Sequence, residues 1–469
     1  MCIEPSWMRL GFTAPPDQVS GQGIGIIIID DLSPHPAISH LAGCLKYVVV
    51  DDDSIICRNI AEQQYDPKLL DHGIHGLMTV LTLAHQPFYS NGLIHTGIAS
   101  GGNFIVLSHG AFKDGEGERL KRGVDWILAN YSHWNIRLIL SLGWHAQDDK
   151  VLLEETKYNP TVQALEAVTR QGIMVICANG NSDIVTILPP REYFAVGGFN
   201  DQGSSDPKRR IPYPGEPYGY NGDGYYRPDI RAPRTRILIP YCEGDADENQ
   251  HSLYTGTSAA STLIAGACMN LLSRFPNLET STLRNALVDN GDLLIGDNNI
   301  ARIINAERAA SAISKGITCM PKEEDAFLDQ TGLTERAIHL SRKIRNGELT
   351  REILWDVSND PSPLIRKIAV YALKEPASPS ERASYWDRFY LEQEDSVRSW
   401  FLYGLLQNSD KTELHHWIPL ASSPHWTIRW CVSDFLSKFS DLPQLVKTHD
   451  PNQVLHYACH VKEWFELQR

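Results

Sequence analysis

Short runs of consecutive apolar residues, many of them β-branched, constrain the fold of this chain more than any other feature. Between Gly23 and Ile317 these runs show no alternation of polar and apolar positions, and longer helical patterns separate them. Strands of that kind are buried on both faces, and intervening helices imply parallel neighbours. The pattern predicts an α/β fold, a doubly wound parallel sheet whose functional side chains follow the carboxyl ends of its strands. The predicted strands are Ile26–Ile29, Tyr47–Val50, Phe104–Leu107, Leu138–Leu140, Ile173–Ile176 and Tyr193–Val196.

The stretch from Asp201 to Asp247 differs from its surroundings because it is rich in Gly, Pro, Tyr and Asp. Such a composition predicts surface loops, here around one short strand, Arg236–Ile239. Further along, Pro321–Glu324 has the composition of a linker, and beyond it every apolar pattern has helical spacing. A chain of 469 residues also exceeds what one hydrophobic core usually supports. We therefore expect two domains, residues 1–320 and residues 325–469, of which the second is all-α.

Weak internal similarity divides the second expected domain. The segments Asp360–Arg366, Asp395–Arg398 and Ser423–Arg429 each end in arginine, and these arginines recur roughly every 31 residues. That period suits two-helix units, each too short to bury its apolar stripe except against a neighbour. The segment resembles HEAT-type repeats, although its period is shorter than theirs and also fits tetratricopeptide-like or irregular helix pairs. Stacked helix pairs of this kind imply a curved surface for binding another protein. Four tryptophans also recur here, and we expect them to fill the core between repeats: Trp400, Trp426, Trp430 and Trp464.

Composition and charge exclude several classes of protein. A net charge of -14 argues against a nucleic-acid backbone as the main partner, because that binding needs clustered cations. The first residues lack the pattern of a signal peptide, and no apolar run approaches the ~18 residues of a membrane helix. Cytoplasmic localisation without a membrane partner is the expectation. The nine cysteines show no C-x-x-C or Cys/His metal spacing, so we expect neither disulfides nor a metal, and no cofactor.

Ser258 lies in Gly-Thr-Ser-Ala-Ala-Ser, directly ahead of an apolar helical pattern. A hydroxyl at a helix N-terminus suits a nucleophile, because the free N–H groups and the dipole favour developing negative charge. The same position suits an N-cap, and for an isolated Gly-Thr-Ser capping is the ordinary interpretation. The longer motif, however, resembles the serine motif of the subtilisin-like serine proteases, the subtilase family. Thr262 stands where that family usually has proline.

This resemblance implies a base and an orienting carboxylate for Ser258. Asp71–Gly76, with the sequence Asp-His-Gly-Ile-His-Gly, matches the family's His-Gly-x-His motif, in which the first histidine, His72, is the base. Asp30 ends an apolar strand, where a carboxylate is costly unless it is paired. The family places its aspartate at this point, with a His-Pro a few residues on, although Asp31 and Leu32 replace the usual small residue and glycine. The implied triad is Asp30, His72 and Ser258, in the chain order of subtilisin.

Further motifs imply how a substrate would be held. Val175–Asn181 resembles the family's Ala-x-Gly-Asn strand end, so Asn181 maps to the donor that stabilises the tetrahedral oxygen. Asn179 then faces the primary substrate pocket. The Ser-Leu-Gly of Ser141, Leu142 and Gly143 resembles the segment that pairs with extended substrate and forms one pocket wall. The resemblance extends across roughly residues 20–315.

The function that these features imply is that of an intracellular serine endopeptidase acting on protein or peptide substrates through an acyl-enzyme. The helical-repeat domain would recruit a protein substrate or an activating partner and leave the chemistry to the first domain. Two alternatives remain open from the sequence. One is a catalytically silent subtilisin-like platform that serves as a protein-interaction module. The other is a peptide ligase or macrocyclase, which passes the same acyl group to an amine.

Overall fold

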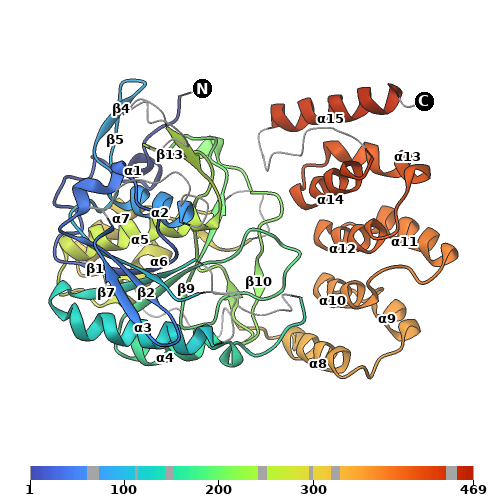
Figure 1. The fold of residues 1–469 in the computed structure, drawn as a ribbon, viewed down its shortest axis with the longest axis horizontal. Coiled ribbons are helices and arrows are strands. Elements are labelled where there is room, and N and C mark those ends of the chain that lie inside the picture. Colours follow the sequence, from blue (N-terminus) through green and yellow to red (C-terminus); the bar gives the residue numbers. More distant parts are fainter. Residues whose placement is uncertain are drawn as a thin grey trace.

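The described residues of the computed structural model form an α/β part followed by a row of helices (Figure 1). They comprise residues 2–60, 73–110, 115–142, 151–240, 251–294, 299–317, 328–439 and 451–467. A nine-stranded sheet crosses the α/β part in the order β15-β12-β9-β8-β7-β1-β6-β2-β3. Its strands are β1 (Gly25–Ile29), β2 (Leu45–Val50), β3 (Ile55–Arg58), β6 (Asn103–Ser108), β7 (Ile136–Ser141), β8 (Met174–Ala178), β9 (Phe194–Phe199), β12 (Ile230–Pro233) and β15 (Arg302–Ile303).

All neighbouring strands of this sheet run parallel except β3, which pairs antiparallel with β2. All six strands expected from the apolar runs are therefore present, with ends that differ by up to three residues. Short antiparallel hairpins accompany the sheet: β4 (Phe88–Ser90) with β5 (Leu93–His95), β10 (Gly219–Tyr220) with β11 (Tyr226–Arg227), and β13 (Ile237–Ile239) with β14 (Ser252–Tyr254).

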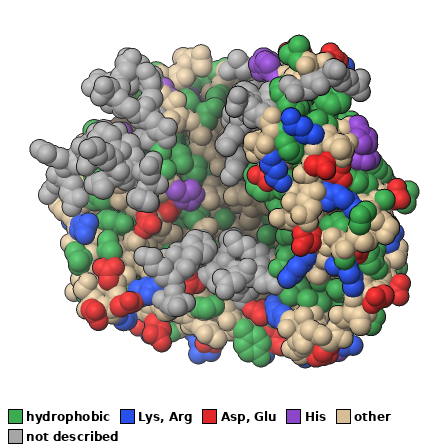
Figure 2. Space-filling view, turned by 45° about the vertical axis from the view of Figure 1, so that its right-hand side comes forward, with side chains coloured by type: hydrophobic (Ala, Val, Ile, Leu, Met, Phe, Trp, Pro, Cys, Tyr) green, Lys and Arg blue, Asp and Glu red, His purple; other side chains and the backbone are tan. Residues whose placement is uncertain are grey.

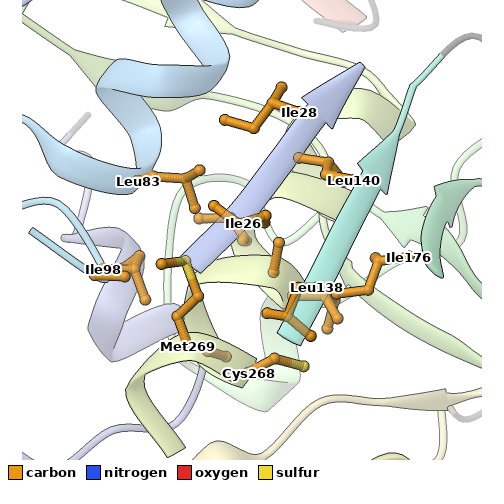
Figure 3. Packing of buried hydrophobic residues seen from close by; sticks show 14 of the residues in the cluster. Ile26, Ile28, Leu83, Ile98, Leu138, Leu140, Ile176, Cys268 and Met269 are labelled. Carbon is orange, nitrogen blue, oxygen red and sulfur yellow. The ribbon is translucent and has the colours of Figure 1, made fainter. Parts of the chain in front are cut away.

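The apolar runs lack polar alternation because both faces of the sheet are buried. In β1, Ile26 and Ile28 point into one core, while Ile27 and Ile29 point into the other. The first core, part of which Figure 3 shows, lies under α1 (Ser6–Arg9), α2 (Ile74–Ala84), α5 (Thr257–Arg274), α6 (Thr280–Asp289) and α7 (Ala306–Ser314). The second core lies under α3 (Glu116–Asn130) and α4 (Pro160–Arg170). This is the doubly wound α/β arrangement.

The expectation of one short strand between Asp201 and Asp247 was wrong. Besides β13, this stretch contains the small hairpin β10–β11 and strand β12, which lies inside the main sheet between β9 and β15. The sequence conceals β12 because it holds a charged residue and a proline. Arg231 is tolerated there because its buried guanidinium donates to the carbonyls of Asn299 and Ala301.

The described residues from 333 onward form helices whose main apolar core is drawn from residues 354 to 461. A smaller buried cluster joins Leu152 and Leu153 of the α/β part to Ala337, Ile365 and Ile368 of α8 and α10. Helices α8, α10, α12 and α14 stack side by side in the row nearest the sheet, and α9, α11 and α13 lie behind them (Figure 1). The expected domain boundary, between residues 320 and 325, lies outside the described residues. The helices are α8 (Leu333–Arg345), α9 (Arg351–Val357), α10 (Pro363–Leu373), α11 (Pro379–Leu391), α12 (Asp395–Leu406), α13 (Leu414–Trp417), α14 (Trp426–Ser437) and α15 (Pro451–Leu467).

Repeated side-chain contacts accompany the repeated helices. Arg366 and Arg429 play the same part, since each donates to two carbonyls of the turn that precedes its helix. The arginines predicted from the sequence thus fix helix starts, although Arg398 instead pairs with Asp395 at 2.8 Å. Among the described helices, none combines the length and the apolarity that crossing a membrane would require.

The helical stack contains a second repeated contact, called the Arg–Glu–Trp ladder below, which the sequence analysis did not predict. Arg351 bonds to Glu381, which also accepts from the indole of Trp355. One repeat later, Arg382 bonds to Glu413, which accepts from the indole of Trp386. The same arginine, glutamate and tryptophan contact therefore links successive helix pairs.

The four tryptophans singled out from the sequence do not simply fill this core. Trp400 and Trp426 aim their indole N–H groups at carbonyls of the α/β part. Trp430 is 36% exposed, whereas Trp400 and Trp464 are partly buried and pack against the core. The buried tryptophans of this region are instead Trp386 and Trp417.

Candidate active site

Three neighbouring strands bring polar side chains to one edge of the sheet. Asp30 follows β1, Ser141 ends β7, and Asn179 follows β8. Strand β1 pairs with β7 and β7 pairs with β8, all parallel, so their carboxyl ends meet at the same edge. This is the edge at which a doubly wound sheet binds ligands.

Ser258 lies in the first turn of α5, which packs against β7, β8, β9 and β12. The residue before this helix, Gly256, has φ 125°, a backbone conformation that side-chain-bearing residues rarely adopt. The first N–H groups of a helix lack partners within it, so the Ser258 N–H group is among those that an anion could use. The prediction that Ser258 lies at the start of a buried helix is therefore confirmed.

The side chain of Asn181 lies beside the turn that carries Ser258. Its Oδ1 accepts from the Thr257 backbone N–H at 2.8 Å and from the Thr257 hydroxyl at 3.0 Å. With the carbonyl oxygen held on the protein side, none of the described residues accepts a hydrogen bond from Nδ2. Nδ2 is thus the donor of this amide that remains for a ligand next to Ser258.

Arg234 also binds the side-chain oxygen of Asn181. The sequence analysis did not predict this role for Arg234. Its guanidinium donates to Asn181 Oδ1 at 2.8 Å and lies over the ring of Tyr213, 3.6 Å from the ring centroid. Burial lowers the pKa of Arg234 to about 10, while the charge of Glu216 opposes that effect. The arginine still keeps its charge near neutral pH. It turns the oxygen of Asn181 inward and therefore the N–H₂ group outward.

Asp30 has a partner that the sequence interpretation treated only as a neighbour. His75, in the first turn of α2, bonds to Asp30 Oδ2 through Nδ1 at 2.6 Å, and the other carboxylate oxygen accepts from the Asp31 N–H at 2.9 Å. His72 itself lies outside the described residues. Helix α2 can approach because Gly76 has no side chain, since a Cβ there would lie 2.1 Å from the Asp31 carbonyl oxygen. That contact explains the second glycine of the His-Gly-Ile-His-Gly motif.

Tyr254 connects His75 to the serine. Its hydroxyl lies 3.2 Å from His75 Nε2 and 3.1 Å from the Thr79 hydroxyl, and it faces the side chains of Ser258 and Thr262. Burial raises the pKa of Tyr254, so the phenol stays neutral and able to donate. Thr262, the residue that replaces the family's proline, donates from its hydroxyl to the Ser258 carbonyl at 2.8 Å. The described hydrogen bonds therefore run from Asp30 through His75 to Tyr254, which lies beside Ser258.

The residues expected to bind substrate lie where the strands end. Ser141 and Asn179 are fully buried, and Asn179 donates from Nδ2 to the Pro217 carbonyl at 2.6 Å. Within the described ranges, neither the Ser141 hydroxyl nor Asn179 Oδ1 has a hydrogen-bond partner. Leu142 is buried just beyond β7, and Gly143 lies outside the described residues. In the same part of the chain no three His, Cys, Asp or Glu side chains gather as a metal site requires.

Comparison with known proteins identifies a family and several relatives that are similar to this chain. A model of the subtilase family matches residues 21–306. Subtilisin Savinase of Lederbergia lenta is 24% identical over 298 residues, which cover 62% of this chain and 92% of the relative. The alkaline protease of Alkalihalobacillus alcalophilus is also 24% identical over 298 residues, covering 62% of this chain and 65% of the relative. The match to a solved structure, a serine mutant of the protease domain of PatA, covers 64% of this chain and 98% of the PatA chain. The sequence identity is 16% and the TM-score is 0.46.

The family match spans more than half of the chain, and the chain therefore belongs to the subtilase family. By class it is a subtilisin-like serine endopeptidase, whose substrates are proteins or peptides.

Proposed function

We propose that this chain is an intracellular endopeptidase that uses Asp30, His72 and Ser258 as its triad and Asn181 as its oxyanion donor. The observation that carries the proposal is the position of the Asn181 amide, which is held beside the helix start of Ser258 with its oxygen turned inward. A donor fixed in advance next to a serine at a helix N-terminus suits the negative charge of a tetrahedral intermediate.

The chemistry follows from these groups. The Ser258 hydroxyl attacks the scissile carbonyl while His72 takes its proton, and Asp30 stabilises the imidazolium that forms. Asn181 Nδ2 and the Ser258 N–H donate to the oxygen as it becomes negative. The imidazolium returns its proton to the leaving amine, which departs and leaves an ester on Ser258. Water then attacks that ester with the same base, releasing the new carboxylate and the free serine.

Substrate would bind as an extended peptide along the chain beyond β7. Ser141, Leu142 and Gly143 would form one wall of the primary pocket, and Asn179 would face its interior. The space-filling view shows the surface hollowed between the α/β part and the helical stack (Figure 2). The Ser141 hydroxyl and Asn179 Oδ1, which have no hydrogen-bond partner among the described residues, are the polar groups that such a pocket could offer.

We further propose that residues 325–469 form a HEAT-like repeat domain that recruits a protein substrate or an activating partner. The end of α11 supports this role, because Tyr390 is 52% exposed and Leu391 is 72% exposed. On the face that Figure 2 shows, basic and acidic side chains are interspersed over the helical stack, as on surfaces that bind proteins rather than nucleic acid.

Comparing the newly formed protein N-termini in cells that express the wild type or Ser258→Ala tests this function directly. Endopeptidase activity predicts termini that appear only with the wild type, and fragments whose summed mass exceeds that of the substrate by one water. Identical termini in both samples would contradict proteolysis and favour a silent platform. Joined or cyclic products without added water would identify a peptide ligase instead.

Recruitment is tested with a double variant, Tyr390→Ser with Leu391→Ser. The variant should cleave short peptides like the wild type and should generate the cellular termini much more slowly. Unchanged cleavage of the cellular substrates would exclude this surface as the recruiting site.

A further inference from the structure

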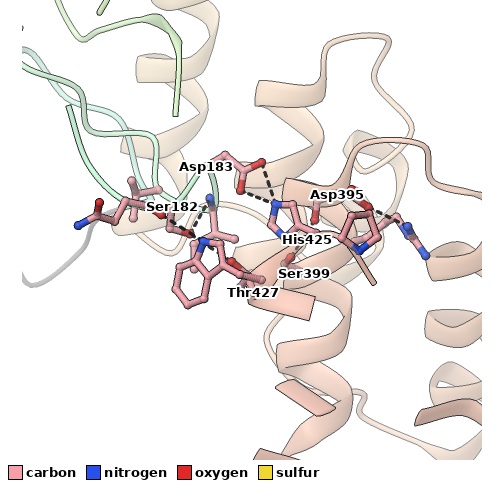
Figure 4. A network of polar contacts seen from close by, with 12 residues as sticks. Ser182, Asp183, Asp395, Ser399, His425 and Thr427 are labelled. Atoms are coloured by element: carbon pink, nitrogen blue, oxygen red, sulfur yellow. Dashed lines mark hydrogen bonds and ion pairs between the residues drawn. The ribbon is translucent and has the colours of Figure 1, made fainter. Parts of the chain in front are cut away.

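The segment Asn181–Val185 connects the candidate oxyanion donor to the helical stack. It begins at Asn181 and contains no helix or strand, so its backbone carbonyls need partners from elsewhere. Figure 4 shows this segment between the α/β part and the starts of the stacked helices. The partners come from α10, α12 and α14.

Long side chains of the stack donate to successive carbonyls of the segment. The indole N–H of Trp426 donates to the Asn181 carbonyl at 3.2 Å, and that of Trp400 donates to Ile184 at 2.9 Å. The ammonium of Lys367 donates to the Asp183 carbonyl at 2.7 Å and to Val185 at 3.0 Å. Four of the five carbonyls thus depend on helices that begin more than 170 residues later in the chain.

Side chains of the segment make contacts in the same direction. The imidazole of His425, 3% exposed, lies 3.0 and 3.2 Å from the two carboxylate oxygens of Asp183. The hydroxyls of Ser182 and Thr427 are 3.4 Å apart. Gly215 leaves room for this arrangement, because a Cβ there would lie 3.0 Å from His425 Nε2. The loop that follows the oxyanion donor is therefore docked through backbone and side chains together.

Asn181 is consequently held at both ends. Its side-chain oxygen is fixed by Thr257 and Arg234 within the α/β part, and its main-chain carbonyl is fixed by Trp426 of the helical stack. Displacing the main chain would move Nδ2 relative to Ser258. A shift of about 1 Å at such a group can cost up to about 10²-fold in rate.

We propose that the helical stack positions the oxyanion donor, with Trp426 and the Asp183–His425 pair as positioning residues that act through Asn181. This inference rests on the proposed function of Asn181. It adds a second role for the helical region, which then sets the rate of the chemical step as well as recruiting a protein. Asn181 contacts the oxygen chiefly in the transition state, so the loss falls on kcat rather than on KM.

The test uses the full chain and a short chromogenic peptide, which does not need recruitment. Trp426→Phe removes the indole N–H, and Trp430→Phe one turn later on α14 is the matched control. We expect Trp426→Phe to lower kcat roughly tenfold with KM changed less than about twofold, while Trp430→Phe stays at the wild-type value. Equal kcat values for the two variants would overturn the proposal.

A second pair of variants distinguishes a specific effect on Asn181 from a general weakening of the interface between the α/β part and the helical stack. Asp183→Ala breaks the ion pair next to Asn181, whereas Glu154→Ala breaks another pair at the same interface, with Arg345 at 3.4 Å. We expect only Asp183→Ala to lower kcat. An equal loss from Glu154→Ala would show that any weakening of the interface slows the enzyme, and that result would contradict a specific role at the oxyanion segment.

The route through Asn181 is tested in a double-mutant cycle. In an Asn181→Ala background, Trp426→Phe and Asp183→Ala should cause no further loss of kcat beyond about twofold. Losses as large as in the wild-type background would overturn the proposal even if Asn181 is the oxyanion donor. Failure of the proposed function looks different, because Asn181→Ala alone would then leave kcat unchanged.

Discussion

Asp30 contacts His75, and the triad hypothesis gives the role of base to His72, so the two histidines must be separated by experiment. We predict that Ser258→Ala and His72→Ala each lower kcat by about 10⁶-fold, the size that such losses have in the subtilisin triad. Asp30→Asn should cost about 10⁴-fold, since the base survives in the wrong tautomer. Peptide hydrolysis by each purified variant measures these losses.

His75→Ala and Asp31→Asn serve as the controls for this ranking. Both should be milder than any triad variant, because His75 Nε2 faces Tyr254 and Asp31 points to the Ser108 hydroxyl. If His75→Ala abolished activity while His72→Ala did not, His75 would be the base. An essential Asp31 with a dispensable Asp30 would likewise overturn the assignment of the carboxylate.

The two asparagines after β8 should have different roles. Asn181→Ala removes the candidate oxyanion donor, and we expect kcat to fall by about 10²–10³-fold with little change in KM. Asn179→Ala should instead change the preference for the residue before the cleaved bond, because this side chain is buried at the expected pocket. Kinetics with a set of peptides differing at that residue measures both effects. Equal losses of kcat without altered preference would contradict the distinction.

The Asp30–His75 pair gives stability a pH dependence of known sign. Partial burial lowers the pKa of His75, but the hydrogen bond and the charge of Asp30 outweigh that effect and raise the pKa above its usual value. The pair therefore stabilises the fold fully below about pH 6.5, the unfolded value, and loses this contribution as the pH rises through the folded pKa. Wild type and His75→Gln should thus differ in free energy of unfolding at low pH and converge at high pH. A difference that grows with pH would contradict this account.

At the scale of elements, the Arg–Glu–Trp ladder predicts which substitutions in the stack lower its free energy of unfolding most. Arg382 contacts Glu413 through two bonds and also donates to the Leu405 carbonyl, and most of its side chain is buried. Arg382→Ala should lower the free energy of unfolding of the helical region by about 2–3 kcal/mol. Arg336→Ala, which breaks the exposed pair with Asp360, should cost less than about 1 kcal/mol. Denaturant unfolding of both variants measures these losses in free energy of unfolding. Similar losses would contradict a special contribution of the Arg–Glu–Trp ladder to stability.

Elements could be predicted where one period governs the sequence. Strand β1 was expected because Ile26 to Ile29 serve two cores, and α5 because its apolar pattern is long. Strand β12 escaped because Arg231 satisfies its charge through carbonyls that are distant in sequence. Trp426 and the indole N–H contact of Trp400 were missed for a related reason, since no local pattern shows that a tryptophan faces another part of the chain.

Site residues divide in the same way, into those that a local pattern locates and those that depend on contacts distant in sequence. Ser258 and Asn181 stand next to recognisable strand and helix ends, so local pattern locates them. The Asp30–His75 bond depends on how closely α2 approaches β1, which no spacing along the chain specifies. Arg234 is hidden for the same reason, although Trp355 and Trp386, each four residues after an arginine, offered a repeat signal that could have been found.

At the scale of the whole molecule, the helical stack contacts the segment that begins at the proposed oxyanion donor, Asn181. The α/β part and the stack each have a main core, and a smaller buried cluster joins Leu152 and Leu153 to Ala337, Ile365 and Ile368. In the proposed site the reacting groups come from the α/β part, whereas the support of Asn181 comes from both parts. A partner that binds the stack could then influence the chemical step as well as the local concentration of substrate.

Labelling by a fluorophosphonate tests the central claim most directly, because this reagent bonds only to a serine activated by its base and oxyanion site. The native wild-type chain should carry one adduct, located on Ser258 by peptide mass spectrometry. Ser258→Ala and heat-unfolded wild type should carry none at that peptide. An unlabelled Ser258 in the native, folded wild-type chain, or an adduct on a different serine, would contradict the account.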